Sequence, residues 1–179
     1  MTQLSIENLT DSFIQSLSRD YLEWARQLHN DPEVLSVLTD PHQISESEQE
    51  RWFNKLQISS SSERLLVFYR DEPIGLIRLD EIDYFNKSVA IGLDIHKDYR
   101  GQGLARPIYQ RILKYFFEEK DFHRVWLLVT DYNKRAINLY HSLGFIDEGC
   151  KRQSIYRDGK FYNYYMMSIL KDEYLSRLT

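Results

Sequence analysis

The sequence predicts a mixed α/β (α+β) fold in which about seven mostly antiparallel strands form one sheet with helices on both faces. Three apolar or aromatic segments follow one another with short turns between them, which favours an antiparallel meander: Arg64–Tyr69, Ile74–Ile82 and Val89–Ile95. A helix pattern, the apolar segment Arg124–Thr130 and a second helix pattern come next. Asp158-Gly159 lies between the last two alternating segments, and this dipeptide is a strong hairpin signal.

The elements expected before the meander are one strand and three helices. Leu4 and Ile6 alternate with polar residues as in a short first strand. Ser18–His29 places its apolar residues on one face of a helix. Pro32 suits the first position of a second helix, and the capping-box pattern Ser45-x-x-Glu48 opens a third.

The elements expected after the meander follow from helical spacing and turn residues. Apolar residues recur at helical spacing in Gly103–Phe117, where Pro107 requires the helix to begin near Gly103 because proline is tolerated only in the first turn. Gly144 closes the later helix. The remaining expected elements are the helix Asn133–Ser142, the hairpin strands Phe145–Tyr156 and Phe161–Ile169, and a short terminal helix Lys171–Leu178.

Length and composition indicate one ordinary globular domain, residues 1–179. The single cysteine excludes an internal disulfide and gives no metal cluster, so no metal is expected. The net charge of −4 argues against a general nucleic-acid binder. No apolar run is long enough to span a membrane, and the first ten residues lack the pattern of a secretion signal, so we expect a cytoplasmic protein without membrane or nucleic-acid partners.

The segment that joins the third meander strand to the next helix is the candidate ligand site. It reads Arg100-Gly101-Gln102-Gly103-Leu104-Ala105. Glycines let a backbone approach a ligand closely, and the amide groups at a helix start favour anions, so this strand, turn and helix start form a phosphate cradle. Arg106 stands where the dinucleotide fingerprint needs a third glycine, and no Lys-Ser/Thr pair follows as in a P-loop.

A second motif follows the next strand: Asn133-x-x-Ala136-Ile137-Asn138-Leu139-Tyr140-x-x-x-Gly144-Phe145. With both motifs in this order, the chain resembles the GNAT superfamily of acetyl-CoA-dependent N-acetyltransferases, and within it the branch that acetylates ribosomal-protein N-termini, polyamines and aminosugars. The resemblance implies the GNAT layout, in which two parallel strands, here Val89–Ile95 and Arg124–Thr130, splay apart to bind coenzyme A. It also implies acetyl-CoA as co-substrate.

The resemblance assigns the cofactor contacts residue by residue. Asn133 is also a candidate helix N-cap, and the two roles are compatible. The oxyanion of the reaction is expected to meet a backbone N–H where the strand bulges near Leu93–Ile95. The positions that correspond to cofactor contacts are Leu93, Ile95, Arg100, Gly101, Gln102, Gly103, Leu104, Ala105, Arg106, Asn133 and Asn138.

The catalytic assignment combines the resemblance with one departure from it. Tyr140 matches the family's tyrosine that protonates the leaving thiolate, and core packing is the other reading of this residue. Relatives in this branch often carry Glu-Ile-Gly where this chain has Ala90-Ile91-Gly92. A protonated amine must lose a proton before it can attack. The candidates for that base are Asp94 and Glu81, with Asp80 and Asp83 in the same acidic group and His96 as a weaker one.

The expected function is transfer of an acetyl group from acetyl-CoA to a primary amine, by direct attack through a ternary complex. The acceptor is a small-molecule amine such as a polyamine or an aminosugar, or a protein N-terminus. The alternative is a non-catalytic acyl-CoA-binding regulatory module, which Ala90 favours and Tyr140 opposes. Asp31-Pro32-Glu33-Val34 resembles a segment near the acceptor pocket of this branch, or is only a helix start. A homodimer is a further expectation, with the aromatic C-terminal hairpin as its candidate surface.

Overall fold

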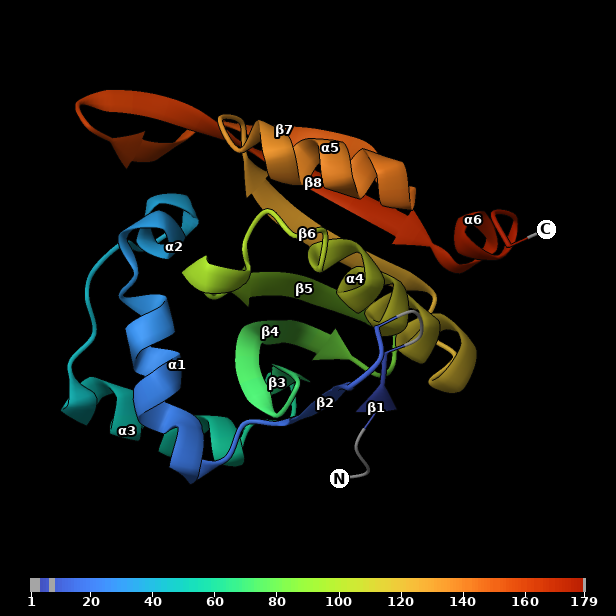
Figure 1. Ribbon diagram of the computed structural model, residues 1–179. Coiled ribbons are helices and arrows are strands. Elements are labelled where there is room, and N and C mark those ends of the chain that lie inside the picture. The colour runs from blue at the N-terminus through green and yellow to red at the C-terminus, as the bar shows by residue number, and fades with distance from the viewer. Residues whose placement is uncertain (1–3, 7–8, 179) are drawn as a thin grey trace.

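One mixed sheet organises the chain in the computed structural model, which describes residues 4–6 and 9–178 (Figure 1). Its strand order is β1-β2-β3-β4-β5-β6-β8-β7, and only β5 and β6 run parallel among the described strands. The mostly antiparallel sheet is therefore confirmed. The strands are β1 (Leu4–Ser5), β2 (Ser12–Ser16), β3 (Glu63–Tyr69), β4 (Glu72–Asp83), β5 (Ser88–Ile95), β6 (Arg124–Thr130), β7 (Ile146–Arg157) and β8 (Lys160–Leu170).

Helices cover both faces of this sheet, as the sequence predicts. Alternate residues of β3 face opposite layers: Val67 packs in the cluster with α4 and α5, and Leu66 packs in the cluster with α1, α2 and α3. Figure 1 shows α4 in front of the central strands and α5 in front of β7 and β8 at the edge of the sheet. The helices are α1 (Leu22–His29), α2 (Pro32–Val37), α3 (Glu46–Gln57), α4 (Ala105–Lys114), α5 (Lys134–Leu143) and α6 (Lys171–Leu175), with a π-helical turn Tyr115–Glu119 after α4.

Side-chain caps fix where the helices begin and end. The Asp31 carboxylate accepts the backbone N–H groups of Glu33 and Val34 at the start of α2. Ser45 and Glu48 form the expected capping box of α3. Asn133 accepts the N–H of Ala136 at the start of α5, so its expected capping role is confirmed. Gly144 has a φ of 103°, the left-handed conformation that ends a helix.

Two elements near the start of the chain differ from those expected. The helix expected over Ser18–His29 begins instead with a 3-10 turn, Arg19–Tyr21, followed by α1. The strand β2 was not expected, because Ser12–Ser16 is short and has serine at both ends. It pairs antiparallel with β3 along its whole length. Pairing with β3 therefore stabilises a strand that the residues of β2 alone do not predict.

The parallel pair β5–β6 opens along its length. Its pairing covers Ser88–Ala90 against Arg124–Trp126, and the register of the described strands continues no further. Beyond it β5 stays paired with β4 and β6 with β8. The N–H of His96 bonds to β4, so the alternation of an antiparallel ladder turns the N–H groups of Leu93 and Ile95 towards the opening. The splayed pair expected from the sequence is present.

Candidate active site

A pocket of about 350 Å³ lies where β5 and β6 separate. It is enclosed by the end of β5, the turn that leads into α4, and residues of α2, α4 and α5. The lining consists of Val34, Val37, Leu93, Asp94, Ile95, Tyr99, Arg100, Gly101, Gly103, Leu104, Ala105, Arg106, Tyr109, Asn133, Arg135, Ala136, Leu139 and Tyr140. The structure thus brings most of the sequence-predicted cofactor positions together with Asp94 and Tyr140.

The turn before α4 has the geometry of a phosphate cradle. Gly101 and Gly103 both have a φ of 80°, a conformation that side chains rarely adopt. No atom lies within 4 Å of where a Cβ would be built at either glycine, so the backbone there is open to a ligand. No side chain caps the start of α4, which leaves its first amide groups to bind an anion. These residues fit the pyrophosphate of a coenzyme A derivative.

The Arg100 side chain is paired with carboxylates of α2. Its guanidinium lies 3.2 Å from Asp31 Oδ1 and 2.9 Å from Glu33 Oε2, and its Nε donates to the carbonyl of Ile95 at 2.8 Å. Burial opposes ionisation of Asp31, but two backbone N–H groups and Arg100 hold the pKa of that carboxyl below its ordinary value. Arg100 therefore ties α2 to the cradle, and its backbone is the part that remains for the ligand.

Tyr140 reaches the pocket from α5 and meets a second tyrosine there. Its hydroxyl lies 3.1 Å from the hydroxyl of Tyr109 on α4. The two rings are edge to face, with centroids 5.4 Å apart. Burial raises the pKa of Tyr140, and the hydrogen bond to Tyr109 acts in the opposite direction. Tyr140 is thus held as a neutral phenol that can donate a proton.

Asp94 stands on the wall between this pocket and a second one. Its carboxylate pairs with Arg78 of β4, at 3.1 Å from Nε to Oδ2 and 3.4 Å from Nη2 to Oδ1. The guanidinium lies across Gly92, where a Cβ would be only 2.8 Å from Nη2. The Asp94 side chain is 10% exposed, so Arg78 fixes the orientation of a largely buried carboxylate.

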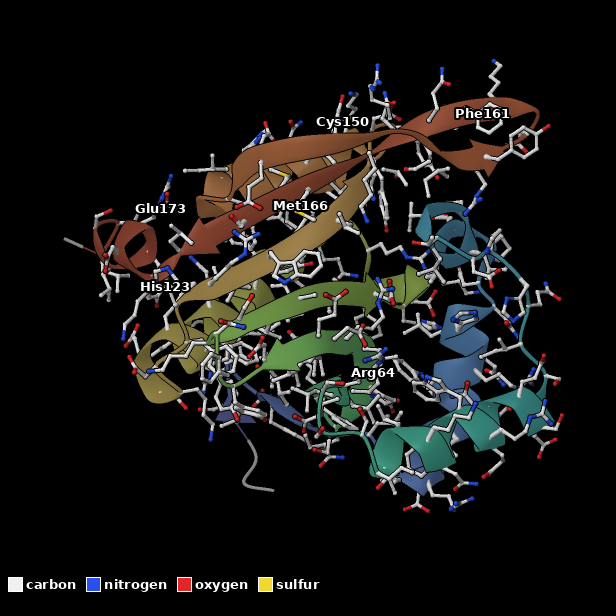
Figure 2. The ribbon with its side chains drawn as sticks, turned by 180° about the vertical axis from the view of Figure 1, so that it is seen from behind. Arg64, His123, Cys150, Phe161, Met166 and Glu173 are labelled. Atoms are coloured by element: carbon white, nitrogen blue, oxygen red, sulfur yellow. The ribbon has the colours of Figure 1, made fainter. Side chains whose placement is uncertain are left out.

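The second pocket has a volume of about 460 Å³ and shares Asp94 with the first. Three carboxylates and two guanidinium groups are among its walls, together with two histidines. Arg64, labelled in Figure 2, is one of these groups. It is paired with Asp80 and lies against the ring of Trp52 from α3. The lining consists of Ala25, Leu28, His29, Leu38, Thr39, Asp40, His42, Ile44, Glu48, Gln49, Trp52, Arg64, Leu76, Arg78 and Asp94.

The other acidic candidates are not brought to either pocket. Glu81 is exposed at the far end of β4, where the register shifts between Asp80 and Asp83 opposite the start of β5. Asp80 forms an ion pair with Arg64 at 2.9 Å, and the Asp83 carboxylate accepts a hydrogen bond from the backbone N–H of Phe85. Asp94 lies at the other end of β5, so of the acidic residues considered from the sequence it alone lines the described pockets near Tyr140.

The remaining sequence expectations concern the rim of the pocket and the end of β5. Gln102 and Asn138 are exposed and lie outside the pocket lining, and the Gln102 side chain donates to the carbonyl of Asp98. The prediction of a bulge at Leu93–Ile95 was wrong. The described pairing of β4 with β5 is unbroken from Gly75, opposite Ile95, to Asp80, opposite Ala90. His96 packs beside the ring of Trp24 and does not line either pocket.

The two pockets also contain residues that the sequence reasoning missed. Val37 belongs to α2 and lines the cradle-side pocket beside Val34, the last residue of the segment that the sequence already marked as resembling one near the acceptor pocket. Tyr109 and Arg78 are polar groups at core-facing positions of an amphipathic helix and an apolar strand, which is the signal that could have marked them. Within the described residues no group of three or more His, Cys, Asp or Glu is placed to hold a metal, and no helix is long and apolar enough to cross a membrane.

The chain is similar in sequence and in fold to known acetyltransferases. Residues 15–145 match the acetyltransferase (GNAT) family. A spermidine N(1)-acetyltransferase of Vibrio cholerae is 30% identical over 92% of this chain and 95% of its own length. A crystal structure of spermidine N-acetyltransferase from Vibrio cholerae with CoA and spermine superimposes with a TM-score of 0.87 at 28% identity, covering 93% of this chain and 99% of that one. A dodecameric structure of the Vibrio cholerae enzyme gives 0.84 at 28% identity, over 95% and 99%.

Proposed function

The chain belongs to the GNAT family of acetyltransferases, and from that premise we propose that the amine it acetylates is a polyamine. The protein is an N-acetyltransferase that transfers an acetyl group from acetyl-CoA to a primary amine. One observation carries the proposal on the acceptor. The cradle-side pocket, which contains Tyr140, and the second pocket meet at the carboxylate of Asp94.

The second pocket suits a cationic acceptor. Asp40, Glu48 and Asp94 contribute three carboxylates against the two guanidinium groups of Arg64 and Arg78. Asp80 and Asp94 neutralise these two guanidinium groups, so Asp40 and Glu48 supply the remaining negative charge of the pocket. The field in the pocket therefore attracts a chain of protonated amines. The spermidine N(1)-acetyltransferase of Vibrio cholerae, which is 30% identical to this chain, supports this acceptor.

The cradle and the open strand edge hold the donor. Bound acetyl-CoA supplies the reactive thioester. Gly101 and Gly103 expose backbone to its pyrophosphate, and Leu93 and Ile95 offer N–H groups along the open edge of β5. One of these N–H groups also stabilises the negative charge that develops on the carbonyl oxygen.

Two side chains move protons on opposite sides of the transferred group. A free alkylamine has a pKa of about 10, so at neutral pH it enters as an ammonium ion. Asp94 accepts a proton from that nitrogen, directly or through one water molecule. Tyr140 donates its hydroxyl proton to the departing sulfur. The attack is direct, without an acyl-enzyme.

The test is release of free coenzyme A thiol from acetyl-CoA. Spermidine and spermine are compared with aminosugars and short peptides, and we expect turnover with the polyamines. Asp94→Asn should lower kcat by about a hundredfold or more, since a general base contributes about 10² to 10⁴ in rate. Glu81→Gln is the matched control, because Glu81 is exposed and outside both pockets, and its kcat should equal that of the wild type.

Each outcome separates the proposal from its alternatives. Turnover confined to peptides or aminosugars would leave an acetyltransferase with a different acceptor. Binding of acetyl-CoA with no turnover on any amine would instead favour the regulatory module, which the comparisons give no reason to prefer. A loss with Glu81→Gln and none with Asp94→Asn would reverse the assignment of the base.

Self-association is part of the proposal. A dodecameric relative supports it. Phe161 lies at the tip of the β7–β8 hairpin, as Figure 2 shows. Tyr156 and Phe161 are 57% and 62% exposed. Light scattering during gel filtration measures the assembly directly. A monomer at micromolar concentration would refute it.

A further inference from the structure

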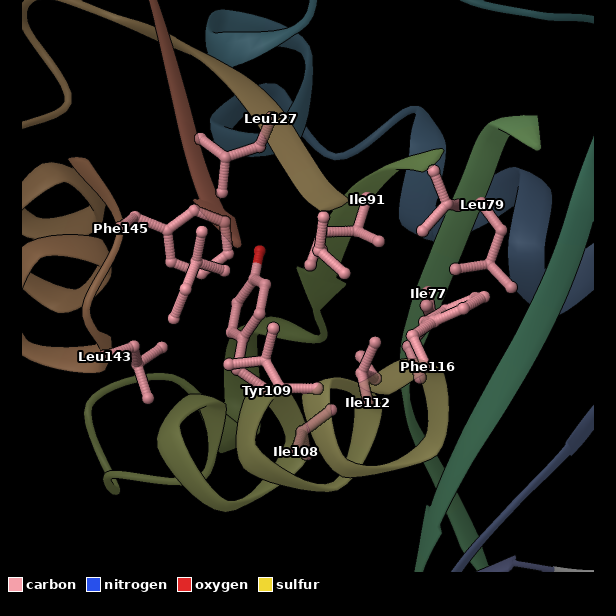
Figure 3. Close-up of a cluster of buried hydrophobic side chains, with 14 of the residues drawn as sticks. Ile77, Leu79, Ile91, Ile108, Tyr109, Ile112, Phe116, Leu127, Leu143 and Phe145 are labelled. Atoms are coloured by element: carbon pink, nitrogen blue, oxygen red, sulfur yellow. The ribbon is translucent and has the colours of Figure 1, made fainter. Parts of the chain in front are cut away.

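Tyr109 carries the only hydroxyl in the buried face of α4. Its side chain is 2% exposed and lies among apolar residues that include Ile91, Leu127 and Phe145, as Figure 3 shows. A tyrosine hydroxyl buried in such surroundings needs a hydrogen-bond partner, since leaving it unpaired is costly. That partner is the hydroxyl of Tyr140, at 3.1 Å. An apolar side chain of similar size would satisfy the core without this requirement.

We propose that Tyr109 is a positioning residue for acetyl transfer, which donates a hydrogen bond to Tyr140 and so directs the Tyr140 proton towards the departing sulfur. The inference rests on the proposed role of Tyr140 as general acid. It does not depend on which amine is acetylated. It assigns a task to a residue that lies outside both sequence motifs.

The donor direction follows from counting protons. Each phenol has one O–H to donate. If Tyr140 is to give its proton to the sulfur, it cannot also donate to Tyr109, so the bond between the two hydroxyls must run from Tyr109 to Tyr140. Tyr109 thereby removes the competing orientation in which the Tyr140 proton points away from the reacting group.

The same bond becomes stronger as the proton leaves. The O–H bond of Tyr140 breaks, an S–H bond forms, and the negative charge passes from sulfur to Tyr140 Oη until solvent returns a proton. A hydrogen bond to an ionised acceptor is roughly twice as strong as one between neutral groups. Tyr109 therefore stabilises the charged form of Tyr140, consistent with its effect of lowering the pKa of that residue against the effect of burial.

Other groups face Tyr140 from neighbouring elements. Arg78 of β4 favours the phenolate, and Asp94 of β5 and Tyr164 of β8 oppose it. The ring of Phe145 packs against Tyr140 with centroids 5.7 Å apart. Of the tyrosine hydroxyls that face Tyr140 within the described structure, that of Tyr109 is the one recorded in a hydrogen bond to it.

The experiment is a double-mutant cycle with Tyr109→Phe, Tyr140→Phe and the combined variant. Phenylalanine keeps the edge-to-face packing and removes only the hydroxyl. We expect Tyr109→Phe to lower kcat by about tenfold to a hundredfold, the range for one hydrogen bond to a charged group, and to leave the KM for the amine unchanged. Because Tyr109 acts through Tyr140, the combined variant should be no slower than Tyr140→Phe alone.

A control and the opposing outcomes complete the test. Tyr115→Phe removes a hydroxyl from the turn after α4, away from both pockets, and should leave kcat unchanged. A wild-type kcat for Tyr109→Phe would overturn the inference. Losses that multiply in the combined variant would also overturn it, because they would show an independent or purely structural role. Absence of turnover in the wild type would overturn the proposed function instead.

Discussion

Gly92→Ala tests whether Arg78 must lie across β5 to orient Asp94. The added Cβ would stand 2.8 Å from Nη2, 3.0 Å from Nε and 3.1 Å from Cζ of Arg78. Ordinary contacts of a Cβ begin at 3.4 Å, so the guanidinium must move outwards by about 0.6 Å, the difference between 3.4 and 2.8 Å. The longer contact, from Nη2 to Asp94 Oδ1, is already 3.4 Å. A shift of this size takes it beyond hydrogen-bonding distance.

We expect the Gly92→Ala substitution to lower the reaction rate much more than the stability of the fold. Alanine in place of glycine within a strand stabilises by roughly 0.5–1 kcal/mol. A weakened bond to a charged group costs about 1.5–3 kcal/mol. The net loss of about 1–2 kcal/mol lowers Tm by only about 2–8 °C in a chain of this size. A displaced base is more costly, since an error of about 1 Å in a reacting group can lower the rate a hundredfold.

The assay is therefore kcat at saturating acetyl-CoA beside a thermal melt. We expect kcat to fall by about tenfold to a hundredfold while the protein remains folded at the assay temperature. Gly149→Ala is the matched control, because no atom lies within 4 Å of a Cβ built there on β7. A Gly92→Ala protein with wild-type kcat, or a crystal structure of it with the Arg78–Asp94 pair unchanged, would refute the reasoning.

Three further results are expected. Tyr140→Phe should lower kcat by about 10² to 10⁴ while isothermal titration gives an unchanged Kd for acetyl-CoA, and equal turnover would remove the general acid. Acetyl-CoA at a hundredfold excess over its Kd should stabilise the fold by about 2.7 kcal/mol, visible as a higher Tm, and no shift would contradict the cradle. Burial lowers the pKa of His29. As the pH falls, His29 is therefore protonated in the unfolded chain before it is protonated in the folded one. The free energy of unfolding should fall as the pH drops below about 6.5. Urea titrations of His29→Gln should show a shallower fall, and an identical slope would exclude His29 as its source.

The sequence indicates the fold through features that are local in the chain. The Ser45 capping box, the Asn133 cap and the Gly144 terminator each depend on residues within one turn, and the structure contains all of them. The strand β2 depends on pairing with β3, which is distant in sequence, and Ser12–Ser16 alone gives little sign of it.

In the candidate site, too, some features are local in the sequence and others depend on residues far apart in it. The glycines of the cradle and Tyr140 lie within sequence motifs and could be identified there. Glu81 and Asp94 look alike in the sequence, and only the antiparallel register shows that they lie at opposite ends of the paired strands. Arg100 shows a different gap, because a motif fixes the residue type while the partners of its side chain, Asp31 and Glu33, come from another helix.

The ion pairs of Arg100 connect the turn before α4 with the start of α2. Asp31 and Glu33 begin α2, whose Val34 and Val37 line the cradle-side pocket, and the chain after α2 supplies Leu38, Thr39 and Asp40 to the second pocket. A donor that shifts α2 would therefore also shift these residues of the second pocket, and the binding of the two molecules would be coupled. By thermodynamic reciprocity, any factor by which acetyl-CoA changes amine binding equals the factor by which the amine changes binding of acetyl-CoA.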